Sequence, residues 1–133
     1  IIGHELKKKE GLLEWFLSQK KVSGYHNVFY SGVTTIELSK IIIKIIKSKN
    51  IYGLYQISSK KISKLKLLHL IKKIYNLKII IKKNIKIKKM LVLNSDKFKK
   101  KTNINVKKWD EQIKEMKKFY VTHQLPIIKN FIS

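Results

Sequence analysis

The sequence predicts an α/β fold in which helices alternate with short strands. Stretches whose apolar residues recur every three to four positions, as in helices, are separated by shorter extended stretches bounded by glycine. The length of 133 residues and the hydrophobic content of 44% fit one globular unit. We therefore expect three or four helices and several short strands.

The first quarter of the chain contains one predicted helix and one extended segment. Ile1 and Ile2 have the pattern of a strand end, and Gly3 begins a turn. A helix is expected over residues 12–19, because four apolar residues fall on one of its faces: Leu12, Leu13, Phe16 and Leu17. Gly24 is expected to end that unit, and residues 25–32 to follow as an extended segment.

Capping residues predict where the next two helices begin. Thr34 is a good N-cap for a helix that runs from Thr35 to about residue 49, and Glu37 is placed to complete a capping box. Residues 51–58 are expected to form a short strand that contains Gly53. Ser63 caps the following helix, whose inward face holds Leu67, Leu68, Ile71, Ile74 and Tyr75.

The remaining elements are two short strands within residues 78–88 and a last helix. Lysine and isoleucine alternate or cluster over 79–89, which is typical of a strand pair with one solvated face. The last helix starts near Trp109, where Asp110 and Glu111 suit the N-terminal dipole. Residues 121–133 carry no firm pattern and are expected to be a tail.

The charge does not identify a partner. The net charge is +23, and a charge of this size usually indicates a polyanion partner. However, all 31 basic residues are lysine, while arginine, which recognises guanine and phosphate through two parallel hydrogen bonds, is absent. Lysine, with 31 residues, and isoleucine, with 23, both have AT-rich codons, so genome base composition accounts for the high lysine content. We expect no nucleic-acid partner.

Composition also bounds the compartment. Cysteine is absent, so disulfides and thiolate metal sites are excluded, and no apolar run reaches the roughly 18–20 residues of a membrane span. No cleavable leader is visible, so we expect a cytoplasmic protein. The lysines and isoleucines of residues 40–49 could form a membrane-surface helix, but a helix that faces the core explains them more simply. We expect no membrane partner.

The residues alone define no catalytic constellation. The five glycines lack the spacing of a dinucleotide or phosphate loop, and no histidine has a second ligand at metal-binding spacing. We expect His69 to be a partly buried structural residue and His123 to be solvated. Asp96 and Asp110 are expected at a turn and at a helix start. No metal site is predicted.

Six short motifs nevertheless occur in an order that carries a resemblance. They are IIGHEL, GLLEWFLSQ, VSGYHNVFYSGVTTIELSKII, GLYQISSKKISKLKLLHLI, LNSDKF and a closing W-x-x-x-I-x-x-M helix. Together they resemble the C-terminal half of the dTDP-4-dehydrorhamnose reductases, within the extended short-chain dehydrogenase/reductase superfamily. The resemblance runs from Ile1 to about Tyr120.

The resemblance implies an enzyme fragment. Residues 1–120 would be the substrate-binding portion, truncated at its N-terminus with the Rossmann domain largely missing, and 121–133 the tail. The family reduces the 4-keto group of a nucleotide-activated deoxysugar with NADPH or NADH, bound mainly by that missing domain. Its acid is a tyrosine with a lysine four residues later, and none of the six tyrosines here has that spacing. We therefore expect no catalytic residue and no turnover in this chain alone.

The resemblance also implies contacts at the start of the chain. The first residues match a segment that passes close to the nicotinamide and the sugar. Ile1 and Gly3 are the expected cofactor contacts, and Ile2, Gly3 and His4 are the expected substrate contacts.

A second implied site is the stretch 86–95, which matches the family segment that contacts the nucleotide-sugar. Lys86, Lys88 and Lys89 would face a diphosphate, and Asn94 would belong to the same site. The family commonly has an arginine where this chain reads Leu91–Asn94, which leaves the substrate open. Ordinary solvated lysines explain these three residues equally well.

Three hypotheses for function follow. The first is a fragment of a nucleotide-sugar reductase of dTDP-rhamnose and polysaccharide biosynthesis, which leaves a homodimer open for the full-length parent. The second is a related nucleotide-sugar epimerase or dehydratase. The third is a basic module that binds nucleic acid or an anionic membrane. A glycine-rich loop and a Tyr-x-x-x-Lys motif upstream would favour the first two.

Overall fold

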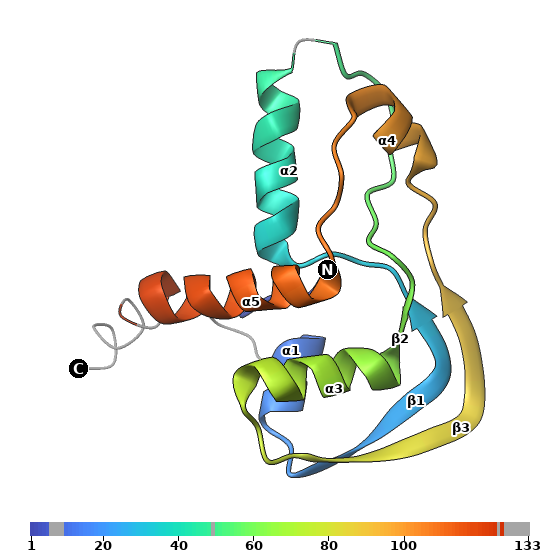
Figure 1. Cartoon of the computed structure of the whole chain (residues 1–133), viewed down its shortest axis with the longest axis vertical. Coiled ribbons are helices and arrows are strands. Elements are labelled where there is room, and N and C mark those ends of the chain that lie inside the picture. The colour runs from blue at the N-terminus through green and yellow to red at the C-terminus, as the bar shows by residue number, and fades with distance from the viewer. Residues whose placement is uncertain (6–9, 49, 125, 127–133) are drawn as a thin grey trace.

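The structure is a computed structural model that describes residues 1–5, 10–48, 50–124 and 126 (Figure 1). The described part confirms the α/β class, with five α-helices where three or four were expected. The helices are α1 (Leu12–Leu17), α2 (Thr35–Lys47), α3 (Lys64–Tyr75), α4 (Asp96–Thr102) and α5 (Trp109–Phe119), and a π-helical turn, η1 (Tyr120–Gln124), follows α5. The strands are β1 (Lys21–Tyr30), β2 (Ile62–Ser63) and β3 (Ile80–Leu91).

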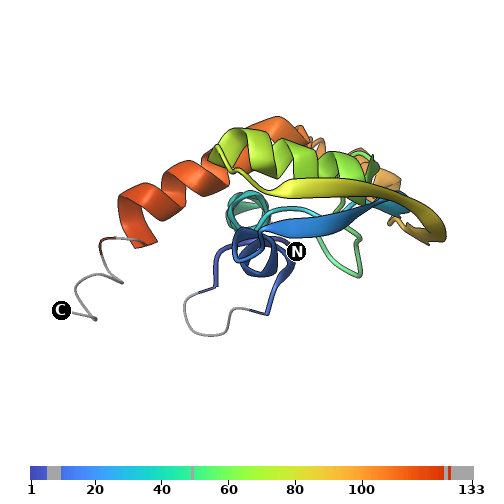
Figure 2. The ribbon, with the colours of Figure 1, turned by 90° about the horizontal axis from the view of Figure 1, so that it is seen from below.

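The three strands form a mixed sheet in the order β2-β1-β3. β1 is antiparallel to β2 and parallel to β3. Figure 2 shows α3 on one side of the β1–β3 ribbon and α1 on the other. β3 is therefore a long edge strand, and most of its residues are exposed.

The predicted pair of short strands over 78–88 is wrong, because β3 is one continuous strand. Tyr25 pairs with Asn84 and Asn27 pairs with Lys88, so residues 85–87 lie opposite a single residue of β1. The Asn27 side chain donates a hydrogen bond to the Ile85 carbonyl at 3.1 Å, which holds this irregularity in place. This irregularity in the register interrupts the pairing of β3 without ending the strand.

Gly24 lies within β1 and does not end the helical unit as expected. A Cβ atom at this position would overlap the Leu65 side chain and would lie 2.8 Å from Cγ2 of Ile81. The absence of a side chain lets α3 approach the strand closely.

The start of the chain confirms the predicted strand end. Ile2 forms a parallel bridge with Thr34, through hydrogen bonds from Ile2 N to Val33 O (3.0 Å) and from Thr35 N to Ile2 O (2.8 Å). The Thr34 hydroxyl caps α2 by accepting from Glu37 N at 3.3 Å. The second half of the expected capping box is not formed, because the Glu37 carboxylate accepts from Lys107 N at 2.9 Å.

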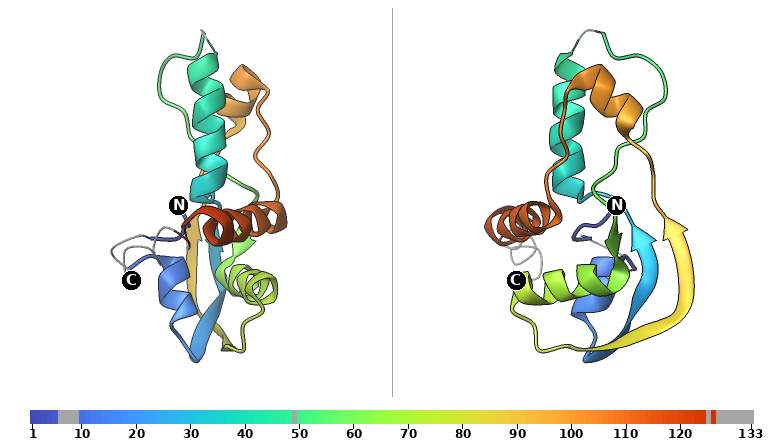
Figure 3. Two further views of the ribbon diagram at one scale, coloured as in Figure 1. Left: turned by 90° about the vertical axis from the view of Figure 1, so that its left-hand side faces the viewer. Right: turned by 45° about the vertical axis from the view of Figure 1, so that its right-hand side comes forward.

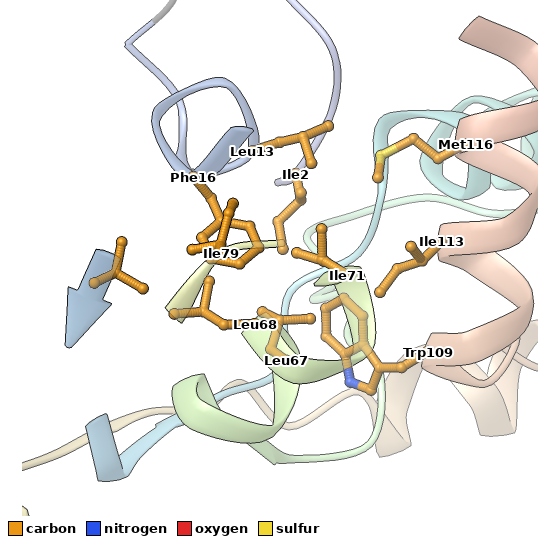
Figure 4. Close-up of a cluster of buried hydrophobic side chains, with 11 residues drawn as sticks. Ile2, Leu13, Phe16, Leu67, Leu68, Ile71, Ile79, Trp109, Ile113 and Met116 are labelled. Carbon is orange, nitrogen blue, oxygen red and sulfur yellow. The ribbon is translucent and has the colours of Figure 1, made fainter. Parts of the chain in front are cut away.

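The main core lies between α1, α3 and α5 (Figure 4). The inward-facing residues predicted for α1 and α3 contribute to it or pack against it. Its buried members are Ile2, Leu13, Phe16, Val22, Leu67, Leu68, Ile71, Ile79, Trp109, Ile113 and Met116. His69, expected to be partly buried on α3, is instead exposed, whereas His123 is exposed as expected.

The other end of the molecule is formed by α2, α4 and the irregular segments beside them (Figure 3). On α2, Ile41 is buried, but Ile42, Ile43 and Ile46 are 44%, 52% and 77% exposed. The expectation that this helix faces the core is therefore right for one side of the helix only. A second exposed apolar group lies on β3 and just after it: Ile80, Ile85, Ile87, Met90, Leu91, Val92 and Leu93.

Two further sequence predictions need correction. Residues 51–58 form no strand, and β2 lies later, directly before the helix that Ser63 caps as predicted. Asp96 lies in the first turn of α4 and not in an isolated turn. Among the described residues, no helix is long and apolar enough to cross a bilayer.

Candidate functional site

Two loop segments meet beyond the carboxyl ends of the parallel strands β1 and β3. One contains Ser58 and Ser59, and the other follows β3. Ser31, one residue after β1, is buried and joins them: its carbonyl accepts from Ser59 N, and its hydroxyl accepts from Leu93 N, both at 2.8 Å. Ser58 Oγ lies 3.1 Å from both Leu93 O and Ser95 Oγ. Crevices at the carboxyl ends of parallel strands are common ligand sites in α/β proteins.

Two adjoining cavities of about 250 and 360 Å³ open between these segments. We call them together the strand-end cleft. Both cavities are lined by Ser58, Ser59, Ser95 and Asp96. The smaller one is completed by Lys60, Phe98, Lys99, Ile104, Asn105 and Val106, and the larger one by Lys61, Val92, Leu93 and Asn94.

The charged groups around the strand-end cleft favour an anion. Lys60, Lys61 and Lys99 line it together with one carboxylate, Asp96, which gives a local charge of +2. All four side chains belong to exposed residues, so they retain much of their hydration and act as flexible point charges. This charge matches a diphosphate bridge whose two phosphates each carry one negative charge.

Two side chains of α5 form hydrogen bonds to residues that line the strand-end cleft. The Trp109 indole N–H donates to the Lys60 carbonyl at 2.7 Å. The fully buried Gln112 side chain donates to Ser59 Oγ, also at 2.7 Å. Because α5 is anchored in the main core, these bonds fix the Ser59 side chain and the Lys60 backbone against a rigid element.

The structure brings one of the expected nucleotide-sugar residues into the cleft. Asn94 lines the larger cavity, and its side-chain oxygen accepts from Asp96 N at 2.8 Å, which leaves its amide NH₂ directed to other partners. Lys86, Lys88 and Lys89 lie on the exposed edge strand β3, and none of them lines either cavity.

The N-terminal segment lies outside the strand-end cleft. The Ile1 side chain is exposed, whereas Ile2 is buried in the core. A Cβ atom on Gly3 would overlap the Thr35 side chain, so this turn packs tightly against the start of α2. None of these three residues lines either cavity.

His4, the other expected substrate residue, turns into the protein. Its side chain is only 3% exposed, and its Nδ1 atom lies 2.8 Å from a carboxylate oxygen of Glu14. The ring stacks on Tyr120 with centroids 3.7 Å apart. Burial lowers the pKa of His4, while the hydrogen bond and charge of Glu14 oppose that shift. In this position the imidazole is a neutral, internally bonded group.

The described residues do not form a dinucleotide cradle. The turn that joins β1 to α2 has one glycine, Gly32, and the Tyr30 hydroxyl occupies the space that a side chain there would need. At the start of α2, the Thr34 hydroxyl accepts from Glu37 N, and Thr35 N donates to the Ile2 carbonyl. Within the described ranges, no cluster of His, Asp or Glu could hold a metal ion.

Sequence reasoning missed most of the cleft. Ser58–Lys61 was assigned to a strand and the stretch before a helix cap, and Gln112 was not singled out. The signal present was local: two serines followed by two lysines, a polar run between an expected strand and a helix. Nothing local indicates that Gln112, 53 residues later, contacts Ser59.

No protein-family model and no curated protein sequence matches the chain. Solved structures do. The dTDP-4-dehydrorhamnose reductase of Bacillus anthracis str. Ames in complex with NADP has a TM-score of 0.71 at 16% identity, over 87% of this chain and 44% of that one. The UDP-N-acetylglucosamine 4-epimerase of Methanobrevibacter ruminantium M1, in complex with UDP-N-acetylmuramic acid, has a TM-score of 0.67 at 15% identity, over 91% and 43%.

A third similar structure is the dTDP-glucose 4,6-dehydratase of Bacillus anthracis str. Ames in complex with NAD, with a TM-score of 0.60 at 13% identity, over 87% of this chain and 40% of that one. The chain thus spans less than half the length of each of these proteins. At these identities the likeness concerns the fold alone: the chain has the fold of about two-fifths of each of these proteins.

Proposed function

We propose that this chain is the substrate-binding portion of an NAD(P)-dependent nucleotide-sugar reductase similar to dTDP-4-dehydrorhamnose reductase, and that the strand-end cleft binds the nucleotide diphosphate. The observation that carries the proposal is the position of a polar cleft of charge +2 at the carboxyl ends of two parallel strands, in a fold shared with such enzymes. NADP or NAD would be bound mainly outside this chain.

The side chains suggest a role for each part of the ligand. Lys60, Lys61 and Lys99 are placed to pair with the two phosphates. The amide NH₂ of Asn94 and the carboxylate of Asp96 supply a donor and an acceptor for sugar hydroxyls. These contacts bind and orient a substrate, and no proton or hydride transfer is assigned to this chain.

A nucleotide-sugar epimerase or dehydratase is the second candidate. Structures of both kinds share the fold, with TM-scores of 0.67 and 0.60. Their ligands would share the diphosphate, so the cleft serves either function. Lys86, Lys88 and Lys89 remain the alternative diphosphate contacts.

The test is a calorimetric titration of the chain with dTDP, with thymidine as the ligand that lacks phosphate. Two double variants remove the same charge: K60A/K61A in the cleft and K88A/K89A on β3. If each exposed lysine contributes about 1 kcal/mol or less, K60A/K61A should weaken dTDP binding on the order of tenfold. K88A/K89A should change it much less, and raised salt should remove that small change.

Two results would contradict the proposal. One is no binding of dTDP by the unmodified chain. The other is a larger loss in K88A/K89A than in K60A/K61A, which would place the diphosphate on β3. The unmodified chain should also oxidise no NADPH in the presence of a dTDP-4-keto-6-deoxysugar, because the acid of the family lies outside it.

A further inference from the structure

Gln112 is a buried polar side chain whose three hydrogen bonds join three separate segments. Its Oε1 accepts from Thr34 N at 3.0 Å, and its Nε2 donates to Lys107 O and to Ser59 Oγ, both at 2.7 Å. The residue has no exposed surface. Ser59 is the one partner of the three that lines the strand-end cleft.

The orientation of the Gln112 amide is fixed by backbone groups of known polarity. Thr34 N–H can only donate, so the amide oxygen must face it. The Lys107 carbonyl can only accept, so the amide nitrogen must face Lys107. The nitrogen therefore also faces Ser59, and the Ser59 hydroxyl oxygen is the acceptor in that contact.

The Ser59 hydroxyl keeps its own proton for another partner. Within the described part of the chain, the Ser59 hydroxyl donates no hydrogen bond. The hydroxyl of its neighbour Ser58 is oriented differently, since it donates to Leu93 O at 3.1 Å. Two adjacent serines thus line the same cleft, and only one has a proton to offer a ligand.

We propose that Ser59 is a ligand-binding residue whose hydroxyl donates to a phosphate oxygen of the bound nucleotide diphosphate, and that Gln112 is the positioning residue that sets this polarity. The inference deepens the proposed function and rests on it. A hydroxyl held as a donor beside three lysines contributes a directional contact that flexible lysine side chains do not provide.

The test measures dTDP affinity by calorimetry in the unmodified chain, Ser59→Ala and Ser58→Ala, with folding checked by circular dichroism. Loss of a hydrogen bond to a charged group should weaken binding by about tenfold or more in Ser59→Ala. Ser58→Ala is the matched comparison. It removes a hydroxyl from the same cleft but should weaken dTDP binding clearly less than Ser59→Ala, because that hydroxyl is already bonded to Leu93.

Gln112 is tested through its effect on Ser59. In Gln112→Glu the carboxylate accepts from the Ser59 hydroxyl and withdraws its proton from the cleft, so dTDP affinity should fall about as far as in Ser59→Ala. Adding Gln112→Glu to Ser59→Ala should cause no further loss, a non-additivity that a general packing defect would not produce. If Gln112→Glu does not fold, Gln112→Met takes its place. Methionine keeps the side-chain volume and leaves the Ser59 hydroxyl free to rotate, so dTDP affinity should fall less than in Gln112→Glu. Adding Gln112→Met to Ser59→Ala should again cause no further loss.

Each outcome decides a separate point. No binding by the unmodified chain overturns the proposed function together with this inference. Binding that is equal in the unmodified chain and in Ser59→Ala overturns the role of Ser59 and leaves the proposed function standing. Additive losses in the double variant overturn the positioning role of Gln112.

Discussion

The Nε2 atom of His4 lies 2.8 Å from the hydroxyl oxygen of Tyr75, 71 residues later in the chain. The Glu14 carboxylate accepts from Nδ1–H on the other side of the ring, so Nε2 is the acceptor and Tyr75 the donor. This contact ties the N-terminal segment to α1 and to the end of α3. Burial, with a contribution from Glu14, raises the pKa of Tyr75, which keeps its hydroxyl protonated as the bond requires.

The first prediction is that this cluster makes stability depend on pH. His4 has a lowered pKa in the folded state, so between its unfolded value of 6.5 and the lower folded value the unfolded chain binds more protons. The free energy of unfolding should therefore be greatest above about pH 6.5 and fall as the pH drops through this window. Urea denaturation from pH 7.5 to 5 measures it.

Variants separate His4 from the other histidines. His4→Gln should flatten the pH dependence and lower stability at pH 7.5 by about 1–3 kcal/mol, because buried hydrogen bonds and the ring stack on Tyr120 are lost. His69→Gln, on the exposed side of α3, should leave the curve unchanged. If the free energy of unfolding still depends on pH in His4→Gln, groups other than His4 cause that dependence.

The second prediction concerns two glycines that are needed for different reasons. Gly24→Ala places a methyl group against Leu65 and Ile81 and should cost about 1–3 kcal/mol of stability. Gly53→Ala meets no neighbour but has a φ of 99°, so it should cost about 1–2 kcal/mol through backbone strain alone. Chemical denaturation gives both values.

A second substitution distinguishes the two causes. Leu65→Ala should recover part of the loss in Gly24→Ala, because it removes the side chain that the new methyl group overlaps. It should recover nothing in Gly53→Ala. Equal behaviour of the two pairs would contradict the close approach of α3 to β1.

The third prediction compares the two sides of α2. Ile41→Lys buries a charge and should cost more than about 3 kcal/mol, whereas Ile46→Lys, at a 77% exposed position, should stay within about 0.5 kcal/mol. Ile46→Lys should also reduce concentration-dependent self-association in sedimentation velocity, since it interrupts an exposed apolar stripe. Similar stabilities for the two variants would contradict the observed orientation of the helix.

The fourth prediction is that the charge of +23 supports only non-specific binding to nucleic acid. Affinity for duplex DNA should fall steeply and linearly with salt on a logarithmic plot, with no preference for sequence, because lysines that neutralise phosphates account for it. Fluorescence anisotropy at several salt concentrations measures this. Sequence-selective binding that persists at about 0.15 M salt would favour the basic-module hypothesis instead.

Local chemistry made part of the fold predictable. The caps Thr34 and Ser63 were read correctly, because a hydroxyl before an apolar periodic run acts on N–H groups within three residues. The strand expected over 51–58 is absent, although its apolar residues suit a strand. The backbone at the end of this region bonds to a distant residue, because Ser59 N donates to the carbonyl of Ser31, 28 residues away. A local pattern does not indicate such a contact.

The candidate site was predictable to a smaller extent. Asn94 was predicted from the resemblance of the stretch 86–95 to a family segment, and the structure places it at the cleft. Ser59 and Gln112 were not, because their importance comes from a contact between an irregular segment and a distant helix. Lys86, Lys88 and Lys89 stood out in a lysine-rich stretch, yet that stretch is an edge strand whose lysines face solvent.

The most direct test of the central claim is an NMR titration of the ¹⁵N-labelled chain with dTDP, with thymidine and inorganic diphosphate as references. Binding of the diphosphate in the strand-end cleft predicts saturable amide shifts that are largest over residues 58–61 and 94–99, from dTDP and from inorganic diphosphate, with much weaker effects from thymidine. Shifts that gather on the lysines of β3, or that are equal for dTDP and thymidine, would contradict a diphosphate site in the cleft.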